Sequence, residues 1–313
     1  MDFELGLLRL PKQILPKPTH VIASSLSLLT LLTGYILAKK FKAHFIAEIR
    51  DIWPLTLISE TRFSASSPLV KVLAWIEKFG YEKADLIVGT MPNLIEHVKA
   101  TTLNHGDVVS IGLGIDPDLK RWMHIPRQEK KSKKFIVGYA GSFGRSNHLD
   151  PLLMMANSLK DDDKIEFRFY GKGDLLDFYQ KTNAEQTNLV FLGQISRQNL
   201  HEELSSCDLL VFSSSDGPEW KYGQSLNKVV EYMALGKPIL GLYSGFPSMI
   251  NEASCGFLVP SSETQLLTDT LEKIRKLSPQ ARFDMGMRGK EWLEINRSYP
   301  RLASTYMSAL KNL

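Results

Sequence analysis

The stretch Phe135-Ile-Val-Gly-Tyr-Ala-Gly-Ser-Phe-Gly144 has the pattern of an apolar strand that ends in a turn with two glycines. A helical pattern begins soon afterwards, near Leu149, and strands and helices then alternate as far as Pro260. A similar alternation runs earlier in the chain, from His20 to Ile111. Because alternating strands and helices build a parallel sheet with helices on its faces, the sequence predicts two α/β units of this kind.

The earlier alternation predicts four strands, at residues 20–23, 44–49, 86–89 and 108–111, and helices up to Lys40, at 69–83 and at 92–100. Residues 21–38 carry no charge. They divide, however, into a short strand, an N-cap at Ser24-Ser25 and a helix from Leu26 to Lys39. No single membrane-spanning helix of about 20 residues is therefore required.

The composition is that of a globular protein: 313 residues with 43% apolar and 23% charged side chains, enough for two domains. The two cysteines, Cys207 and Cys255, have neither metal-ligand spacing nor a disulfide pattern, which favours buried thiols in a reducing cytosol. Basic and aromatic residues do not interleave as in nucleic-acid-binding proteins.

The net charge of +4 comes from the first part of the chain, where Lys39, Lys40 and Lys42 cluster and residues 127–134 form a second basic run. One interpretation is attraction to anionic lipid, or to a lipid-diphosphate acceptor, at the cytoplasmic leaflet. The other is a solvated helix end and a polar linker. The residues alone leave both open.

A short helix is predicted within residues 225–238, Ser-Leu-Asn-Lys-Val-Val-Glu-Tyr-Met-Ala-Leu-Gly-Lys-Pro. Ser225 is a suitable N-cap, and Asn227 and Lys228 fall in the first turn, where amides and a cation can hold phosphate. Glu231 follows Lys228 at i+3 and could hydrogen-bond a ribose diol. The alternative is a capped helix whose Lys228 and Glu231 form a surface ion pair.

Several segments of the second alternation, in this order, resemble the nucleotide-binding half of the family-4 (group 1) GT-B glycosyltransferases. They are Phe135–Gly144, Phe167–Asp174 (with a G-x-G turn), Asn188–Gly193, Asp208–Ser213, the Asn-Lys-x-x-Glu-Tyr-Met helix at 227–233, and Gly256–Pro260. Short glycine motifs occur by chance, so each segment alone is weak, but six in one order form a specific pattern.

The first half carries its own resemblance, in Lys17–Ser25, Glu48–Pro54 ("RD-x-WP"), Ala84–Val88 and Ile111–Asp116. The family opens with a further strand and a Gly-Gly loop upstream of these motifs. We therefore expect an N-terminally shortened chain with a GT-B architecture of two Rossmann-like parallel-sheet domains facing a cleft, the first one incomplete. The expected division is an acceptor-side domain at 1–125, a nucleotide-sugar domain at 126–298, and a helix at 299–313 that crosses back to the first domain.

The resemblance and the position of the turns imply a donor site built from these residues: Gly141, Ser142, Gly144, Arg145, Tyr170, Gly171, Lys172, Gly193, Gln194, Ile195, Ser225, Asn227, Lys228 and Glu231. Gly141, Ser142 and Gly144 would bring amides to a diphosphate, or else form a turn that needs positive φ. Residues 170–172 and 193–195 would frame the base by backbone contacts and a partial stack. Taken alone, Lys172 is better explained as a solvated loop lysine.

Two positions depart from the family pattern. Gly223 stands eight residues before Glu231, where members often have a second glutamate that contacts the donor sugar, and Asp216 or Glu219 could replace it. Asn147 stands where the family often has a lysine. Lys228 and Arg145 then remain as the phosphate cations.

On the acceptor side, Asp51 follows a predicted buried strand and could position or deprotonate an acceptor hydroxyl. The neighbouring Arg50 could instead neutralise Asp51 or hold a phosphate. With Lys228 and Glu231, Asp51 completes the predicted catalytic set. A retaining reaction, as in this family, would need no protein nucleophile if Lys228 and backbone amides stabilise the leaving diphosphate.

We therefore predict a cytosolic, hexosyltransferase-type enzyme, in peripheral contact with the membrane, that moves a sugar from a nucleotide sugar, expected to be UDP-linked. The acceptor would be a glycan or lipid-diphosphate-linked acceptor in surface polysaccharide (O-antigen or capsule) synthesis, with no cofactor, metal or nucleic acid. The alternatives are a nucleotide-sugar epimerase of the same fold and a catalytically silent nucleotide-sugar-binding protein.

Overall fold

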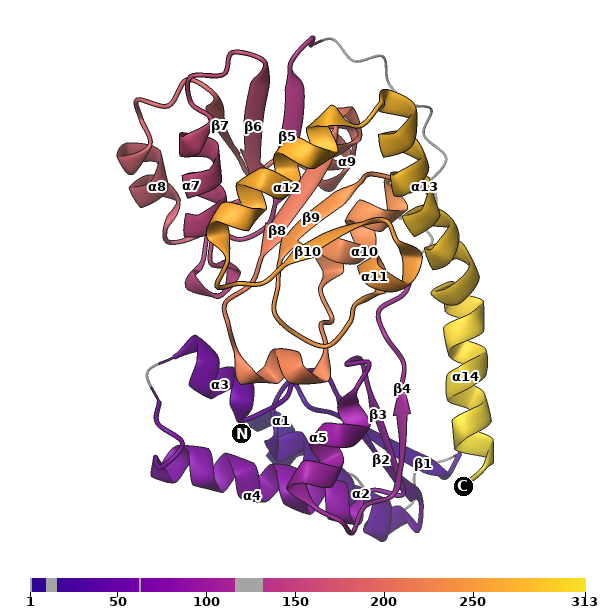
Figure 1. The fold of residues 1–313 in the computed structure, drawn as a ribbon. Helices are drawn as coiled ribbons and strands as arrows, with labels where there is room; N and C mark the ends of the chain where they lie inside the picture. The colour runs from indigo at the N-terminus through magenta and orange to yellow at the C-terminus, as the bar shows by residue number, and fades with distance from the viewer. Residues whose placement is uncertain (1, 10–15, 62, 116–131) are drawn as a thin grey trace. The chain divides into compact units, whose positions relative to one another are not determined.

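The computed structural model describes residues 2–9, 16–61, 63–115 and 132–313 (Figure 1). The chain forms two compact units. The first comprises residues 1–113, 217–225 and 300–313, and the second comprises residues 114–216 and 226–299. Most of the predicted linker and of the basic run at 127–134 lies outside the described residues.

The described part of the first unit contains a four-stranded parallel sheet in the order β1-β2-β3-β4. The strands are β1 (His20–Ser24), β2 (His44–Ile49), β3 (Leu86–Gly89) and β4 (Asp107–Ser110). Its helices are α1 (Asp2–Leu8), α2 (Leu29–Phe41), α3 (Leu55–Glu60), α4 (Pro68–Lys83) and α5 (Leu94–Thr101). The predicted bounds of β2 and β3 are correct, because both strands are short runs of buried apolar residues between polar ends.

The start of α2 differs from the prediction. Leu28 occupies the N-cap position, and no side chain caps the helix. The Ser25 hydroxyl is engaged elsewhere, because its oxygen accepts a hydrogen bond from the Arg50 amide at 2.9 Å. Thr30 stabilises the turn before the helix by donating to the Ser24 carbonyl at 2.7 Å. The predicted N-cap at Ser24-Ser25 is therefore wrong.

The last helix, α14 (Tyr299–Lys311), packs on the sheet of the first unit. Tyr306 and Leu310 lie against the buried side chains of Ile46 and Val88. The Tyr306 hydroxyl donates to Glu48 Oε2 at 3.4 Å.

A 3₁₀ segment from the later part of the sequence, η2 (Pro218–Tyr222), also belongs to the first unit. The Tyr222 ring lies edge-on to His97, with the centroids 4.8 Å apart. His97 Nε2 is in turn 2.7 Å from Glu77 Oε1, and both side chains are buried. This buried polar network anchors the segment.

The second unit has a six-stranded parallel sheet in the order β10-β9-β8-β5-β6-β7. Its strands are β5 (Phe135–Ala140), β6 (Ile165–Tyr170), β7 (Leu189–Gly193), β8 (Leu209–Ser213), β9 (Ile239–Leu242) and β10 (Gly256–Val259). Its helices are α7 (Asp150–Ser158), α8 (Leu176–Thr182), α9 (Arg197–Ser206), α10 (Asn227–Ala234), α11 (Met249–Ala253), α12 (Thr264–Lys276) and α13 (Pro279–Asn296), with a 3₁₀ turn, η1 (Arg145–Asn147), after β5. The strand order reverses between β5 and β8, and open α/β sheets bind ligands at such a point.

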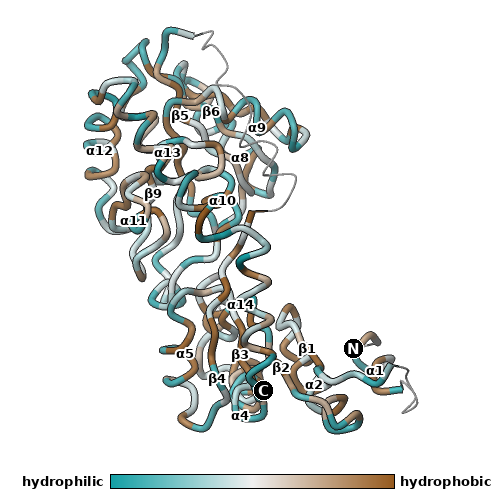
Figure 2. The backbone as a smooth tube through the Cα atoms, turned by 90° about the vertical axis from the view of Figure 1, so that its right-hand side faces the viewer, coloured by the Kyte–Doolittle hydropathy of each residue, from teal (hydrophilic) through white to brown (hydrophobic). Residues whose placement is uncertain are grey.

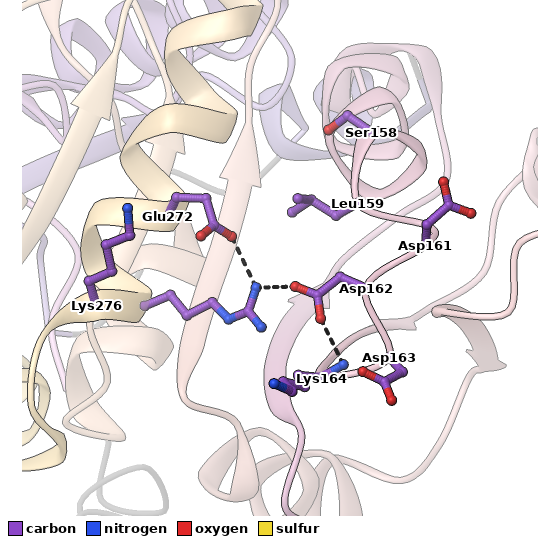
Figure 3. A pocket seen from close by; sticks show the side chains of 9 residues that line it. Ser158, Leu159, Asp161, Asp162, Asp163, Lys164, Glu272 and Lys276 are labelled. Atoms are coloured by element: carbon purple, nitrogen blue, oxygen red, sulfur yellow. Dashed lines mark hydrogen bonds and ion pairs between the residues drawn. The ribbon is translucent and has the colours of Figure 1, made fainter.

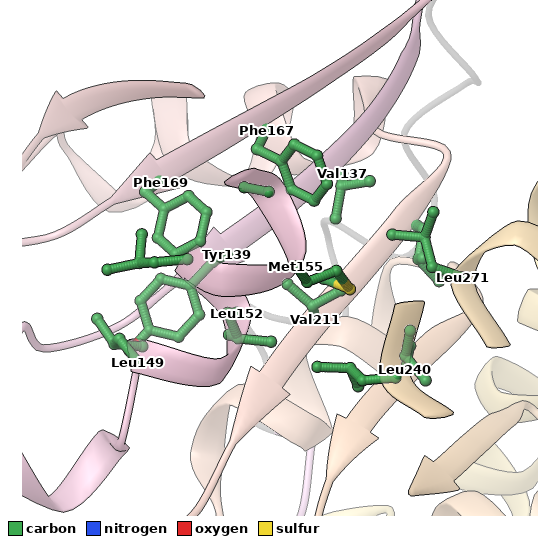
Figure 4. Close-up of a cluster of buried hydrophobic side chains, with 14 of the residues drawn as sticks. Val137, Tyr139, Leu149, Leu152, Met155, Phe167, Phe169, Val211, Leu240 and Leu271 are labelled. Carbon is green, nitrogen blue, oxygen red and sulfur yellow. The ribbon is translucent and has the colours of Figure 1, made fainter. Parts of the chain in front are cut away.

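The core of the second unit lies between the sheet and the helices α7 and α12 (Figure 4). Phe167, Phe169 and Tyr139 are fully buried there, next to Met155 of α7 and Leu271 of α12. Each buried ring removes a large apolar surface from water. The strands and this helix layer therefore form a firm base for the turns at the strand ends.

The helices show the mixed polarity expected of helices that cover a sheet; α12 carries both apolar and polar residues in Figure 2. Within the described ranges, no helix combines the length and the apolar character needed to cross a membrane. Cys207 and Cys255 are buried free thiols.

A shallow depression of about 760 Å³ lies before the amino-terminal end of β6 (Figure 3). Three of its charged side chains form one network. Arg275 of α12 donates to Asp162 at 2.5 Å and to Glu272 at 3.1 Å, and the pairing lowers the pKa of the Asp162 carboxyl. This network ties α12 to the turn before β6, so we assign it a structural role.

Candidate functional site

The turns that follow β5, β6 and β7 contact one another through their backbones. The Gly141 amide donates to the Tyr170 carbonyl at 3.0 Å, and the Gly171 amide donates to the Gly193 carbonyl at 2.8 Å. Gly171 has a φ of +143°, and a Cβ on it would lie 1.8 Å from the Gly141 carbonyl oxygen. Only glycine permits this approach.

These turns form one wall of a pocket of about 450 Å³. The pocket is lined by Gly141, Ser142, Tyr170, Gly171, Lys172, Gln194, Ile195, Arg197, Leu200 and Glu231. All of these residues except Arg197 and Leu200, which belong to α9, are in the predicted site. The structure thus brings together residues from four separate segments of the sequence.

Neither Gly141 nor Gly144 has a positive φ, so the turn after β5 does not need glycine for this reason. Gly144 has a φ of −107°, and Gly141 is likewise outside the left-handed region. A Cβ on Gly141 would instead approach the Tyr139 hydroxyl at 2.6 Å and Lys228 Nζ at 3.0 Å. Gly141 is therefore required for space, because it lets an ammonium group approach the backbone of the turn.

Lys228 is in the first turn of α10, and its ammonium group points to the carboxyl end of β5. It donates a hydrogen bond to Asn147 Oδ1 and lies 5.1 Å from the centroid of the Tyr139 ring. Its burial lowers the pKa of the Lys228 ammonium to about 8. A bound anion beside Lys228 would stabilise the charged ammonium and so offset the effect of burial.

Glu231 does not pair with Lys228, so the surface ion pair considered as an alternative is not formed. Its carboxylate lines the pocket and accepts from Arg197 Nη2 at 3.5 Å. Arg197 is the first residue of α9, whose N-cap, Ser196, accepts from the Asn199 amide. The sequence contained a signal for Arg197, because a helix start after β7 places this residue at the same sheet edge as the other turns.

Ser225 is not the N-cap of α10. Leu226 occupies this position, and its carbonyl accepts the first helical hydrogen bonds, from Val229 and Val230. Ser225 belongs to the first unit, and Asn227 is an exposed first residue of the helix. Serine is a preferred N-cap residue, but the backbone conformation places the N-cap of this helix one residue after Ser225.

Tyr170 lines the pocket, but its side chain contributes little exposed surface. The Tyr170 side chain is 2% exposed, and its hydroxyl donates to Glu203 Oε2 of α9 at 2.9 Å. The predicted frame of a base by residues 170–172 and 193–195, through backbone contacts and a partial stack, therefore stays a prediction. The predicted site residues that do not line the pocket are Gly144, Arg145, Gly193, Ser225, Asn227 and Lys228. Two of them contact lining residues: Gly193 accepts the hydrogen bond from the Gly171 amide, and Lys228 Nζ lies beside Gly141.

Tyr232, which sequence reasoning missed, fixes α10 against the sheet. Its buried hydroxyl accepts from the Ala140 amide at 2.8 Å and donates to the Ala140 carbonyl at 3.2 Å. Both groups stand at the end of β5, one residue before Gly141. The helix that carries Lys228 and Glu231 is therefore held in register with the first turn.

Asp51 lies in the first unit, directly after β2. Although the residue is exposed, enough protein surrounds its carboxyl to raise the pKa of Asp51. Arg50 forms its ion pair with Glu48 at 2.8 Å, not with Asp51. Glu219 is buried and accepts from the Ser59 hydroxyl at 2.9 Å, which gives it a structural contact in the first unit.

A family model described as glycosyl transferases group 1 matches residues 120–292, more than half of the chain. A search of curated proteins found no match. Similar solved structures include sucrose-phosphate synthase from Thermosynechococcus elongatus (TM-score 0.70, 16% identity, 95% of this chain and 73% of that chain). HepE from Anabaena in complex with UDP and glucose is also similar (0.65, 16%, 94% and 78%).

WaaG, a glycosyltransferase involved in lipopolysaccharide biosynthesis, is similar over 91% of this chain and 84% of its own, with a TM-score of 0.67 and 16% identity. At such identities these likenesses show the fold, and they confirm the predicted GT-B architecture with two parallel-sheet domains. The family follows from the matching model. The chain belongs to the group 1 glycosyltransferases.

Proposed function

We propose that the pocket at the ends of β5, β6 and β7 binds a nucleotide sugar, and that the protein transfers its hexosyl group to a hydroxyl of a glycan or lipid-linked acceptor. One observation carries this proposal: a half-buried ammonium, Lys228, and a carboxylate, Glu231, lie one helical turn apart beside a glycine turn. These two groups match two parts of a nucleoside diphosphate, the diphosphate and the ribose. The diphosphate needs a cation and amides, and the ribose diol needs an acceptor.

The remaining wall suits a base. Ile195 and Leu200 are apolar, and Gln194 offers both a donor and an acceptor. UDP is the nucleotide that we expect, and the HepE structure contains UDP in that protein. The same pocket could serve an epimerase or a silent binding protein, so transfer must be tested separately from binding.

The proposed reaction breaks the bond between the sugar C1 and the diphosphate oxygen and forms a bond between C1 and the acceptor oxygen. Lys228 and the amides of the first turn would stabilise the charge on the leaving diphosphate. Asp51 would position the acceptor hydroxyl or take its proton. We expect retention at C1, with no metal or cofactor.

Calorimetry with the whole protein tests the binding step. We expect UDP to bind, and we expect Glu231→Gln to lower its affinity about tenfold, because a hydrogen bond to a charged group contributes roughly 1.5–3 kcal/mol. Glu185→Gln, at an exposed position of the same unit, is the matched control and should leave binding unchanged. Absence of heat with every nucleoside diphosphate would reject the site. If a UDP-sugar binds but no acceptor takes up its sugar with release of UDP, the result would favour the silent binding protein.

We propose that contact with a membrane surface would be made by α4. Val72 and Trp75, which are 53% and 58% exposed, share one face of this helix with Lys71 and Lys78. Trp75 is supported from the side by Phe79, with ring centroids 5.8 Å apart. Exposed apolar side chains flanked by lysines fit an anionic lipid interface, where the rings enter the headgroup layer and the ammonium groups remain in water.

Vesicle sedimentation should therefore show binding to vesicles with phosphatidylglycerol and little binding to phosphatidylcholine alone. Lys71→Glu with Lys78→Glu should reduce binding tenfold or more, because each lysine near an anionic surface contributes about 1 kcal/mol and the reversed charges add repulsion. Trp75→Ser should also weaken binding. Phe178→Ser removes an equally exposed ring from the second unit and is the control. Equal binding by all variants would remove α4 from the interface.

A further inference from the structure

Asn147 meets the Lys228 ammonium across 81 positions of sequence. Its backbone is fixed independently of this contact. The buried hydroxyl of Ser213, at the end of β8, lies 2.7 Å from both the Asn147 and the His148 carbonyl oxygens and shares its single proton between them. The η1 turn is thereby fastened to the sheet, and the Asn147 amide presents its oxygen to Lys228.

Lys228 Nζ thus lies within a cage of neutral groups. Asn147 Oδ1 accepts its hydrogen bond, the Tyr139 ring lies beside it, and Gly141 leaves room for it next to the backbone. Burial raises the pKa of Tyr139, so this ring keeps its proton. The acid on the same helix, Glu231, contacts Arg197 instead.

We propose that Asn147 is a positioning residue, which holds the Lys228 ammonium at the phosphate-binding turn without neutralising it. This inference rests on the proposed nucleotide site. A lysine has a long, flexible stem, and holding it in one conformation costs side-chain entropy. An amide oxygen fixes the ammonium before the ligand arrives and leaves its whole charge for the diphosphate. A carboxylate at 147 would fix it equally well but would cancel that charge.

Asn147→Asp and Asn147→Ala separate positioning from simple structural support. We expect Asn147→Asp to raise the titration midpoint of Lys228 in the ligand-free protein, followed by NMR of the lysine side chain, because the new carboxylate favours the charged amine. Its UDP affinity should fall at least tenfold, while weak binding of uridine, which has no phosphate, should be unchanged. Asn147→Ala should weaken UDP binding less, because the charge survives and only its placement is lost.

Asn157→Asp adds the same charge at an exposed position of α7 and is the control for both readouts. If wild type binds UDP and Asn147→Asp binds it equally well, or if the Lys228 midpoint does not move, Asn147 is no positioning residue. If wild type does not bind UDP, the proposed function fails instead. Equal losses of UDP and uridine binding would show that the substitution disrupts the pocket, which would also overturn the inference.

Discussion

Lys228→Ala is expected to lower the affinity for UDP by about 10- to 100-fold, because a hydrogen bond between charged groups contributes roughly 1.5–3 kcal/mol. The ammonium is half-buried beside the Gly141 turn, where water screens it less than at the surface. The loss should be confined to phosphate-bearing ligands. Lys181→Ala, which removes an exposed lysine from the same unit, should bind UDP like wild type.

The pH dependence gives a second signature of Lys228. In the free protein the pKa of its ammonium is about 8, and a bound diphosphate must raise that pKa. Binding therefore takes up a proton when the pH is above 8. UDP affinity should fall as pH rises from about 7 to 9, and less steeply in Lys228→Ala. Lys228→Arg should keep the affinity nearly constant over this range, since a guanidinium stays protonated.

Calorimetry at several pH values and two salt concentrations measures both effects. Because one charge pair is lost, UDP binding by Lys228→Ala should respond less to ionic strength than binding by wild type. A wild-type affinity that stays constant from pH 7 to 9, together with an unchanged salt response in the variant, would place the Lys228 ammonium away from the phosphates.

The strands of both sheets could be predicted from the sequence, because a buried strand is visible as a local run of apolar residues. Strands such as β5 and β8 are buried along their whole length and appear as short apolar runs between turns. Helix α10 was also predictable, because its apolar residues recur at helical spacing before Gly236. The convergence of the turns followed from topology, since the carboxyl ends of parallel strands meet at one edge.

Contacts between residues far apart in the chain could not be predicted from local patterns. The Tyr170 ring turns to Glu203 on α9, and no pattern within β6 reveals this partner. Likewise, an i+3 spacing suggested a pair between Lys228 and Glu231, but each side chain has a different partner from another segment. Local spacing states which side chains can meet on a helix, whereas tertiary packing decides which do.

Gly171→Ala is expected to be the most damaging small substitution at this site. The residue has a φ of +143°, a conformation that costs other residues about 1–3 kcal/mol. The added methyl would also lie 1.8 Å from the Gly141 carbonyl oxygen, so the turns after β5 and β6 would have to separate. Hydrogen exchange at the ends of these strands should speed up, and UDP affinity should fall sharply.

Gly193→Ala is the matched comparison for this substitution. Gly193 has a φ of +66°, and a Cβ there would meet no atom within 4 Å. Its cost should be limited to about 1 kcal/mol of left-handed backbone strain, without a steric clash. Urea unfolding should therefore rank Gly171→Ala as clearly less stable than Gly193→Ala. If both variants lose the same small amount and bind UDP equally, the close contact between the two turns does not shape the pocket, because the backbones can separate without consequence for the ligand.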